Sequence, residues 1–285
     1  MIKKYFYKII RFLFRYKLFW SITKPFVNFF NTLEVQKYWT DRRQLDNYIK
    51  EKILVEPVVR NGYFKGMRYP GFQAAGSAIY PKFIGSYESE LTPIFQKLIS
   101  NKYDTIIDVG CAEGYYAVGL AMLLPTANVF AYDTEVYARN LCQQIATLNK
   151  VQDRITIKGT LNANELKNFD FTNKKTFIIS DCEGFEKQLF TADNIANLKN
   201  CDVLIETHDL FDLTISAYII ALFKETHNAP IVISSLDDNK KAQTYHYPET
   251  EKLDLNTKKI VFAESRNAIM EWLFFSSKNS NNNLN

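Results

Sequence analysis

The sequence predicts an α/β fold in which a doubly wound, mostly parallel sheet of seven strands has an antiparallel end. Short apolar runs rich in β-branched and aromatic residues alternate with stretches of helical periodicity, a pattern typical of a parallel sheet covered on both faces. The last two runs have no clear helix between them, which predicts the antiparallel end. An N-terminal extension of helical and β-hairpin character precedes this Rossmann-like unit.

Strands and helices can be assigned along the chain. The expected strands occupy residues 105–109, 128–132, 154–158, 176–180, 202–206, 231–235 and 271–276. The expected helices occupy residues 86–99, 115–124, 135–149, 185–190 and 213–226. Ligands of open α/β sheets bind beyond the carboxyl ends of the strands, so functional residues are sought directly after each strand.

Composition places the 285-residue chain among globular proteins. Hydrophobic residues make up 47% and charged residues 23%, which allows a sizeable core and excludes a disordered protein. The formal net charge of +4 does not identify the whole molecule as a binder of polyanions. The four cysteines form no CxxC pair, so we expect reduced thiols, no zinc site and a cytoplasmic protein.

Four segments follow from the distribution of residue types. Residues 1–53 form a basic aromatic arm, residues 54–100 a cap or entry segment rich in turn residues, residues 101–276 the α/β domain, and residues 277–285 a disordered polar tail. Within the cap, the run VVRNGYFKGMRYP fits a β-hairpin. No secretory signal or membrane-spanning segment is expected, because cations interrupt the apolar N-terminal stretch.

The arm is expected to form an amphipathic helix. Its cations, spaced 4, 3 and 4 residues apart, form one stripe: Lys4, Lys8, Arg11 and Arg15. Apolar side chains lie on the opposite side: Phe6, Ile9, Leu13, Tyr16 and Trp20. Such a helix suits an anionic bilayer, so residues 1–24 predict peripheral attachment to the inner face of a membrane. The alternative is packing on the rest of the protein or on a second subunit; the oligomeric state is not predicted.

A glycine-containing turn follows the first strand and precedes the helix that begins near Tyr115. The turn residues are Asp108, Val109, Gly110, Cys111, Ala112, Glu113 and Gly114. Glycine lets the backbone approach a ligand closely, and the following helix offers free N–H groups. A nicotinamide-binding turn would read GxGxxG, but Ala112 and Tyr115 occupy two of those glycine positions.

The turn resembles the D-x-G-x-G-x-G signature of class I S-adenosylmethionine (SAM)-dependent methyltransferases, with Ala112 in place of the middle glycine. This resemblance implies SAM as the cofactor. It also implies six cofactor-binding residues in the turn: Asp108, Gly110, Cys111, Ala112, Glu113 and Gly114. The acid at Asp108 favours SAM on charge grounds as well, because SAM carries a sulfonium and an ammonium whereas a dinucleotide carries a pyrophosphate. The alternative is that Asp108 only holds the turn.

Two further strand ends are expected to contact the cofactor. Asp133 follows the second strand about 20 residues after the glycine turn, where an acid accepts hydrogen bonds from ribose hydroxyls. Leu161 and Asn162 follow the third strand, where the superfamily usually contacts adenine. The alternative for this pair is an ordinary loop.

The catalytic rim is expected after the fourth and fifth strands. Asp181 and Glu183 follow one strand, and Glu206 and His208 belong to the end of the other. SAM is already an activated electrophile, so the protein must align the acceptor and remove its proton. His208 is the expected general base, oriented by Glu206 or Asp209. Asp181 would orient the acceptor or lie near the methyl donor; the alternative for His208 is a hydrogen-bonded loop histidine.

The leading interpretation assigns no metal site. If a divalent ion took part, Asp181, Glu206 and His208 would be its ligands, and the ion would acidify a diol acceptor. Oxygen-rich ligands would favour Mg²⁺ or Mn²⁺.

The segment DCEGFE (181–186) resembles the D-x-E-G-x-E segment of FkbM-type methyltransferases, in a likeness that covers about residues 103–275. It implies O-methylation, often of sugar or polyketide-derived hydroxyls. By their positions in this motif, the resemblance implies functional roles for Asp181, Glu183 and Glu186. Glu183 would contact SAM or the acceptor, and Glu186 would only cap the following helix.

The run GSYESEL (85–91) is the expected entry segment, with Tyr87 and Glu90 on the cofactor side. The overall hypothesis is a SAM-dependent O-methyltransferase acting on a hydroxyl of a glycan, glycolipid or related small molecule. The alternative is a catalytically silent methyltransferase-like binding or scaffold protein at the membrane surface, disfavoured because the chain keeps Asp108, Asp133 and Asp181.

Three other classes are disfavoured. The broken GxGxxG pattern argues against a nicotinamide-dependent oxidoreductase. Nucleic acid is not an expected partner, because the rim lacks the N/D-P-P-Y/F tetrapeptide of amino-group methylases. Hydrolase chemistry lacks a GxSxG elbow.

Overall fold

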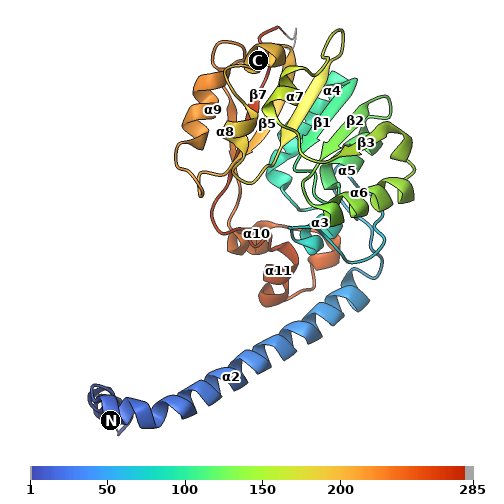
Figure 1. Cartoon of the computed structure of the whole chain (residues 1–285). Coiled ribbons are helices and arrows are strands. Elements are labelled where there is room, and N and C mark those ends of the chain that lie inside the picture. Colours follow the sequence, from blue (N-terminus) through green and yellow to red (C-terminus); the bar gives the residue numbers. More distant parts are fainter. Residues whose placement is uncertain (1, 280–285) are drawn as a thin grey trace. The chain divides into compact units, whose positions relative to one another are not determined.

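The computed structural model describes residues 2–279, and the chain divides into two units (Figure 1). The first unit contains the residues up to Val55, and the second those from Glu56 onward. Three side chains expected on the two faces of the arm lie outside the described part: Lys4, Phe6 and Ile9.

The second unit is built on a seven-stranded sheet with the order β3-β2-β1-β4-β5-β7-β6. Its strands are β1 (Thr105–Val109), β2 (Asn128–Tyr132), β3 (Ile155–Lys158), β4 (Thr176–Ser180), β5 (Cys201–Thr207), β6 (Ile231–Ser234) and β7 (Glu271–Phe275). The first five strands are parallel, and β7 runs antiparallel to both of its neighbours. The predicted fold class and its antiparallel end are confirmed, and every strand end lies within one residue of the expected position.

The order of the strands reverses at β1. Asp108 of β1 lies opposite Ala131 of β2 and Ile179 of β4, and Ser180 of β4 lies opposite Ile205 of β5. The carboxyl ends of these parallel strands therefore lie along one edge of the sheet. This edge, next to the reversal, is where open α/β sheets bind ligands.

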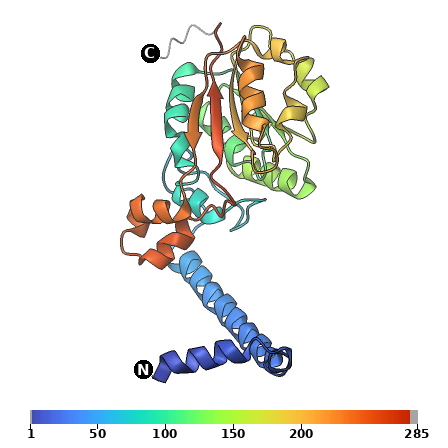
Figure 2. The same ribbon diagram turned by 90° about the vertical axis from the view of Figure 1, so that its left-hand side faces the viewer.

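Helices cover both faces of this sheet. On one face lie α4 (Thr92–Asn101), α5 (Tyr115–Leu123) and α6 (Val136–Leu148), and on the other α7 (Ala163–Lys167), α8 (Glu186–Leu189) and α9 (Ile215–Phe223). Figure 2 shows α4 and α9 on opposite sides of the sheet. Helices therefore follow the expected alternation with the parallel strands.

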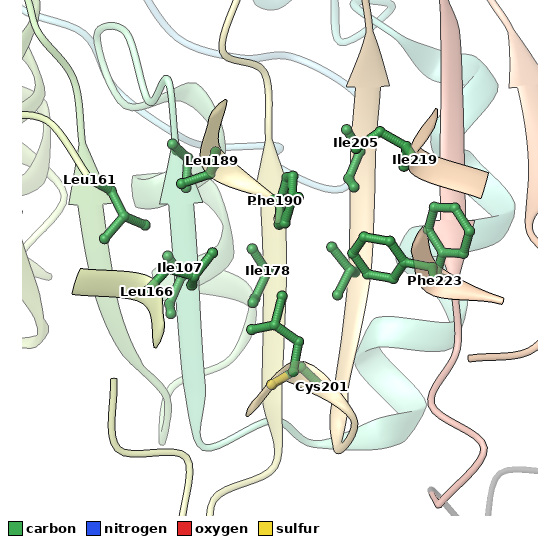
Figure 3. Packing of buried hydrophobic residues seen from close by; sticks show 14 of the residues in the cluster. Ile107, Leu161, Leu166, Ile178, Leu189, Phe190, Cys201, Ile205, Ile219 and Phe223 are labelled. Atoms are coloured by element: carbon green, nitrogen blue, oxygen red, sulfur yellow. The ribbon is translucent and has the colours of Figure 1, made fainter. Parts of the chain in front are cut away.

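The core on the α7–α9 face fixes the strand ends (Figure 3). It joins Ile107, Ile178 and Ile205 of three neighbouring strands to helix residues, all fully buried: Leu166, Leu189, Ile219 and Phe223. Burying each such side chain contributes about 1.5–3 kcal/mol. The turns after β1, β4 and β5 thus start from rigid positions.

The predicted hairpin of the cap is present only as a minimal antiparallel pairing. Residues 58–70 form no pair of strands: Val58 and Arg68 make one isolated bridge, and the Val59 N–H donates to the Met67 carbonyl at 2.9 Å. Residues 61–66 form turns, so too few residues of the segment are extended to form the hydrogen-bond ladder of a longer hairpin.

The expected helix over residues 86–99 starts later than predicted, with one 3₁₀ turn (Ser89–Leu91) that leads into α4. The short helix α3 (Ile79–Ile84) precedes this range, and α4 begins only at Thr92. Between them, Glu88 adopts a φ of 47°, which no right-handed helix accommodates. Pro93 in the first turn then suits the later start of α4.

Two helices lie between β6 and β7, where the sequence predicted none. They are α10 (Asp238–Thr244) and α11 (Leu255–Phe262). The carboxylates of Asp237 and Asp254 accept N–H groups of the first turns and so start these helices. Both helices are short and mostly polar, which leaves little periodicity to detect. Helix α11 packs against α3, so this insertion, residues 235–270, joins the cap (Figure 1).

The described part of the expected tail is ordered against the sheet unit. Ser277 is buried; its N–H donates to Asp202 Oδ1 at 2.8 Å and its hydroxyl donates to the Lys199 carbonyl at 2.5 Å. The expected start of the tail at residue 277 is therefore too early.

The first unit consists of helices. These are α1 (Ile2–Leu13), α2 (Lys17–Tyr48) and one π-helical turn (Ile49–Ile53), and α2 has no buried residue. Within residues 2–279, we find no helix with both the length and the apolarity needed to cross a membrane.

Candidate active site

A pocket of 760 Å³ lies at the carboxyl ends of the parallel strands, a size typical of small-molecule sites. One wall consists of the turns after β1, β2, β3, β4 and β5, and the other of cap residues 74–87 and insertion residues 264–270. The lining carries six carboxylates, those of Asp133, Glu135, Asp181, Glu183, Glu206 and Glu264, against two permanent cations, Lys82 and Arg266. The pocket therefore favours a cationic ligand over an anionic one.

The turn after β1 lies directly against the turn after β4. Gly110 has a φ of 80°, and a Cβ atom there would lie 1.7 Å from the Asp181 carbonyl oxygen. Gly114 has a φ of 93°, and its Cβ would lie 2.6 Å from Cys142 Sγ of α6. Both positions thus require glycine, which is the physical basis of the predicted glycine turn.

Asp133 joins the turns after β1 and β2. Its Oδ2 accepts the Ala112 N–H at 2.8 Å and its Oδ1 accepts the Glu135 N–H at 2.8 Å. Ala112 itself has a φ of 48°, a left-handed conformation that glycine adopts more easily than alanine. Each carboxylate oxygen keeps acceptor capacity for a ligand hydroxyl, because a carboxylate offers about four lone-pair sites.

The predicted cofactor residues divide into two groups. Those that line the pocket are Gly110, Cys111, Ala112, Asp133, Leu161, Asp181 and Tyr87. Five others do not line it: Asp108, Glu113, Gly114, Asn162 and Glu90. Asn162 instead caps α7, accepting the Glu165 N–H at 2.9 Å. Glu90 instead accepts the Leu236 N–H at 2.7 Å and lies 3.2 Å from Lys241 Nζ.

Asp108 lies under the turn rather than on the pocket surface. Its side chain is buried and accepts a backbone hydrogen bond from Ala117 in α5. Burial, followed by the charge of Asp181, raises the pKa of Asp108 to about 8. This placement fits the alternative interpretation, in which Asp108 holds the turn and the start of α5.

The four predicted rim residues come together. His208 Nε2 lies 3.4 Å from Asp181 Oδ1, 3.5 Å from Glu183 Oε2 and 3.7 Å from Glu206 Oε2. His208 and Glu206 are buried, whereas Glu183 is largely exposed. Asp181 Oδ1 is buried and has no hydrogen-bond partner among residues 2–279.

Glu186 orients His208. The sequence analysis had assigned this role to Glu206 or Asp209. Glu186 is fully buried, and its Oε1 lies 2.5 Å from His208 Nδ1. Asp209 instead accepts the Ser216 N–H at 3.0 Å, at the start of α9. The expectation that Glu186 only caps its helix is therefore wrong. Its position in the DCEGFE segment was the available signal.

The surrounding carboxylates change the protonation of His208. Burial alone would lower its pKa, but the hydrogen bond to Glu186 and the charges of Asp181, Glu186 and Glu183 together raise it above the ordinary value. Burial, followed by the charge of Asp181, raises the pKa of Glu206. The rim therefore holds excess negative charge that a proton or another cation would relieve.

Arg266 connects the insertion to the rim and was not predicted. Its guanidinium contacts Glu206 and Glu88 through short ion pairs and lies 3.1 Å from Glu264 Oε2. Tyr116 of α5 donates a hydrogen bond to the same Glu88 carboxylate. These contacts join positions up to 178 residues apart, so no local pattern signals them.

Lys82 links the cap to the glycine turn and was also missed. Its ammonium lies 2.5 Å from Glu113 Oε1, with both side chains buried, and donates to Ser77 Oγ at 2.6 Å. The Ala75 N–H donates to the other Glu113 oxygen at 3.1 Å. Glu113 therefore holds the cap in place, and it does not line the pocket in which the cofactor was predicted to bind.

The residues near His208 also fit a divalent cation. Ligand atoms of Asp181, Glu206 and His208 all lie within 4.8 Å of one another. One imidazole nitrogen with carboxylate oxygens suits Mn²⁺ or Mg²⁺. The Glu186 carboxylate on Nδ1 is the partner that metal-bound histidines usually have. Arg266 occupies one oxygen of Glu206 and leaves Oε2 for an ion.

The sheet order, with its antiparallel β7, is the Rossmann-like fold of class I methyltransferases. No family model and no curated protein matches the chain. Among solved structures it is similar to the O-methyltransferase TomG of Streptomyces achromogenes, in complex with SAM, at 12% identity over 68% of this chain and 81% of that one (TM-score 0.43). It is also similar to a SAM-dependent O-methyltransferase of Thermotoga maritima, at 16% identity over 68% of this chain and 66% of that one (TM-score 0.43). Because identities this low describe at most a shared fold, we assign the fold from the strand order itself.

Proposed function

We propose that the chain is a SAM-dependent methyltransferase that transfers the methyl group to a hydroxyl oxygen. The observation that carries the proposal is the charge of the pocket: its two cations are both engaged in ion pairs, while its carboxylates outnumber them. A sulfonium and an ammonium are stabilised in such surroundings, whereas a pyrophosphate is repelled. In further support, Asp133 after β2 lines the pocket, where its carboxylate would accept hydrogen bonds from the ribose hydroxyls of SAM.

His208 is the proposed general base. When bound, SAM supplies an activated methyl group, so the protein has to position the acceptor and remove one proton. Glu186 holds Nδ1–H and leaves Nε2 facing the pocket, within 3.4 Å of Asp181. Nε2 would take the hydroxyl proton as the oxygen bonds to the methyl carbon and the carbon–sulfur bond breaks. Asp181 and Glu206 then stabilise the imidazolium.

A metal-assisted version of the same reaction is the second candidate, favoured by the cluster of ligand atoms described above. Asp181, Glu206 and His208 would hold a divalent cation, which would lower the pKa of the acceptor hydroxyl. His208 cannot be ligand and base at once, so the two versions are exclusive. Activity that survives chelation with EDTA would support the base, and activity restored only by Mn²⁺ or Mg²⁺ would support the metal.

For the acceptor, we propose a hydroxyl of a glycan or glycolipid. In support, exposed side chains of Leu210 and Phe211 line the pocket at its rim and offer an apolar surface for a sugar ring or lipid stem. The resemblance of residues 181–186 to FkbM-type enzymes points the same way. Transfer of labelled methyl to a glycolipid extract is the expected result, and label found only in protein or RNA would contradict it.

The decisive test is calorimetric titration of the purified chain with SAM and, separately, with NAD. We expect SAM to bind, and we expect Asp133→Ala to abolish that binding. The matched control is Asp193→Ala, which removes an exposed acid that does not line the pocket. NAD binding without SAM binding would overturn the proposal, and binding of neither would favour a silent methyltransferase-like scaffold.

A further inference from the structure

The first unit exposes an unusual amount of apolar surface. In α2, Leu18 is 75% exposed, Phe26 67% and Phe30 61%, and no residue of the helix is buried. In α1, Tyr5 and Tyr7 are exposed as well. Exposed apolar surface of this extent marks a binding face, because soluble proteins rarely leave such side chains in contiguous patches.

Five exposed apolar side chains lie on one face of α2. They are spaced 4, 4, 3 and 4 residues apart: Leu18, Ile22, Phe26, Phe29 and Leu33. Three polar residues of the same stretch lie on the opposite side of the helix: Lys24, Asn28 and Asn31. The spacing of the apolar residues follows the helical repeat, so residues 18–33 present a continuous apolar stripe.

Charge along the first unit is distributed unevenly. The first 33 residues carry seven cations and no acid: Lys3, Lys4, Lys8, Arg11, Arg15, Lys17 and Lys24. From Glu34 onward both signs occur, and Lys37 pairs with Asp41 at 2.7 Å within the helix. The apolar stripe therefore lies in the part of the first unit that carries cations and no acid, with six of the cations before the stripe and Lys24 within it.

The hydroxyl groups of the stripe segment are satisfied within the helix. Ser21 donates to the Lys17 carbonyl at 3.0 Å, Thr23 to the Phe19 carbonyl at 2.9 Å, and Thr32 to the Asn28 carbonyl at 2.9 Å. A hydroxyl that already has an acceptor costs less to remove from water. This lowers the cost of placing residues 17–33 in an interfacial environment.

We propose that residues 1–33 bind the surface of an anionic lipid bilayer, with the apolar stripe in the headgroup–acyl boundary and the cations on lipid phosphates. Charge decides between this partner and a second copy of the chain. Two copies packed through the stripe would bring unbalanced cations together, whereas anionic lipid neutralises them. This inference concerns the first unit only and does not depend on the proposed reaction.

The test is co-sedimentation of the full chain with vesicles of phosphatidylcholine alone and of phosphatidylcholine mixed with phosphatidylglycerol. We expect pelleting with the anionic vesicles, weakened by added salt. The variant Lys8→Gln/Arg11→Gln/Arg15→Gln should bind about 100-fold more weakly. The matched control, Lys37→Gln/Arg42→Gln/Arg43→Gln, removes as many cations from the mixed-charge part of α2 and should bind as the wild type does.

The apolar stripe is tested in the same way. Phe26→Ser/Phe29→Ser/Leu33→Ser should lower partitioning at least about tenfold, whereas Val35→Ser/Tyr38→Ser/Trp39→Ser should not. Equal losses in both variants, or no pelleting of the wild type, would overturn the proposal. So would a dimer, detected by light scattering without vesicles, that the stripe variant dissociates. Far-UV circular dichroism verifies that each variant keeps its helices, so the membrane test stays separate from the proposed reaction.

Discussion

The two walls of the pocket are held by different kinds of interaction. On the sheet wall, backbone conformation sets the geometry: Gly110 packs on the Asp181 carbonyl, and Asp133 accepts two backbone N–H groups. On the cap wall, buried side-chain ion pairs set the geometry, with Lys82 on Glu113 and Arg266 among three carboxylates. The first wall depends on backbone groups at the ends of the strands, and the second on charged side chains of the cap and the insertion.

This difference determines which mutations each wall tolerates. The sheet wall is destabilised when a side chain is added at a glycine, because the new Cβ atom overlaps backbone atoms that cannot move aside. A wall made of buried ion pairs fails when one partner is removed, since the other charge is left without solvent or partner.

The largest expected effect is on the cap wall. Arg266→Met should lower the free energy of unfolding by about 3–5 kcal/mol, because buried carboxylates of Glu88 and Glu206 lose their cation. Urea unfolding measures it. Lys187→Met is the control: it breaks the more exposed pair with Asp212 and should lower the free energy of unfolding far less. Similar losses in the two variants would remove the distinction between the walls.

On the sheet wall, Gly110→Ala should cost about 3 kcal/mol, combining a positive φ with an overlap of backbone atoms. SAM affinity should fall with it, because the same turn lines the pocket. Gly71→Ala, which meets no atom within 4 Å and lies outside the pocket lining, is the matched control and should be neutral. A stable, SAM-binding Gly110→Ala protein would show that the turn is less constrained than its geometry indicates.

The protonation of two histidines contrasts the charged pocket with an apolar site. The pKa of His208 is raised, whereas burial lowers the pKa of His227, next to the Cys201 carbonyl. When the two imidazoles are titrated and followed by NMR, His208 should therefore stay protonated to higher pH than His227. The stability that His208 contributes is present below its ordinary pKa of about 6.5 and is lost as pH rises through the raised value.

Glu183→Gln sharpens that titration. Removing its charge should lower the pKa of His208 and leave that of His227 unchanged. Glu225→Gln, at an exposed acid, is the control. Unchanged titration of His208 in Glu183→Gln would mean that the carboxylates do not set its protonation.

The smallest expected effect concerns Ala112. Ala112→Gly should raise the free energy of unfolding by about 1 kcal/mol or less, because relief of the left-handed φ exceeds the entropy that glycine adds to the unfolded chain. Ala112→Val should lower it. Thermal unfolding of both variants measures the difference, and a loss in the glycine variant would mean that the alanine methyl group packs usefully.

The contrast between the walls also explains what the sequence could predict. The strands and the glycine turn were predictable, because apolar runs and Gly110 are local signals. The meeting of Asp181, Glu206 and His208 followed from strand order. Arg266 was not predictable, because its partners come from distant segments and a lone arginine usually indicates a solvated surface.

Two predictions failed for different reasons: the missed helices α10 and α11 had a local signal, and the cofactor assignments of Asp108 and Glu113 relied on motif position alone. Asp237 and Asp254 each precede a helical turn and could have indicated α10 and α11 as N-caps. Asp108 and Glu113 were assigned to the cofactor because they stand in the glycine turn, yet backbone direction buries one under α5 and pairs the other with Lys82. The position of a residue in a motif therefore predicts which region of the fold it belongs to, but not which groups its side chain contacts.

The close packing of Gly110 on the Asp181 carbonyl has a consequence for protein engineering. The segment that would hold the methyl donor and the segment that would hold the acceptor share one backbone contact, so neither loop can be lengthened or exchanged alone. A redesign of acceptor preference would keep both loops and vary exposed rim side chains such as Glu183 and Phe211. New specificity would then be obtained by changing the surface of the pocket while its frame stays intact.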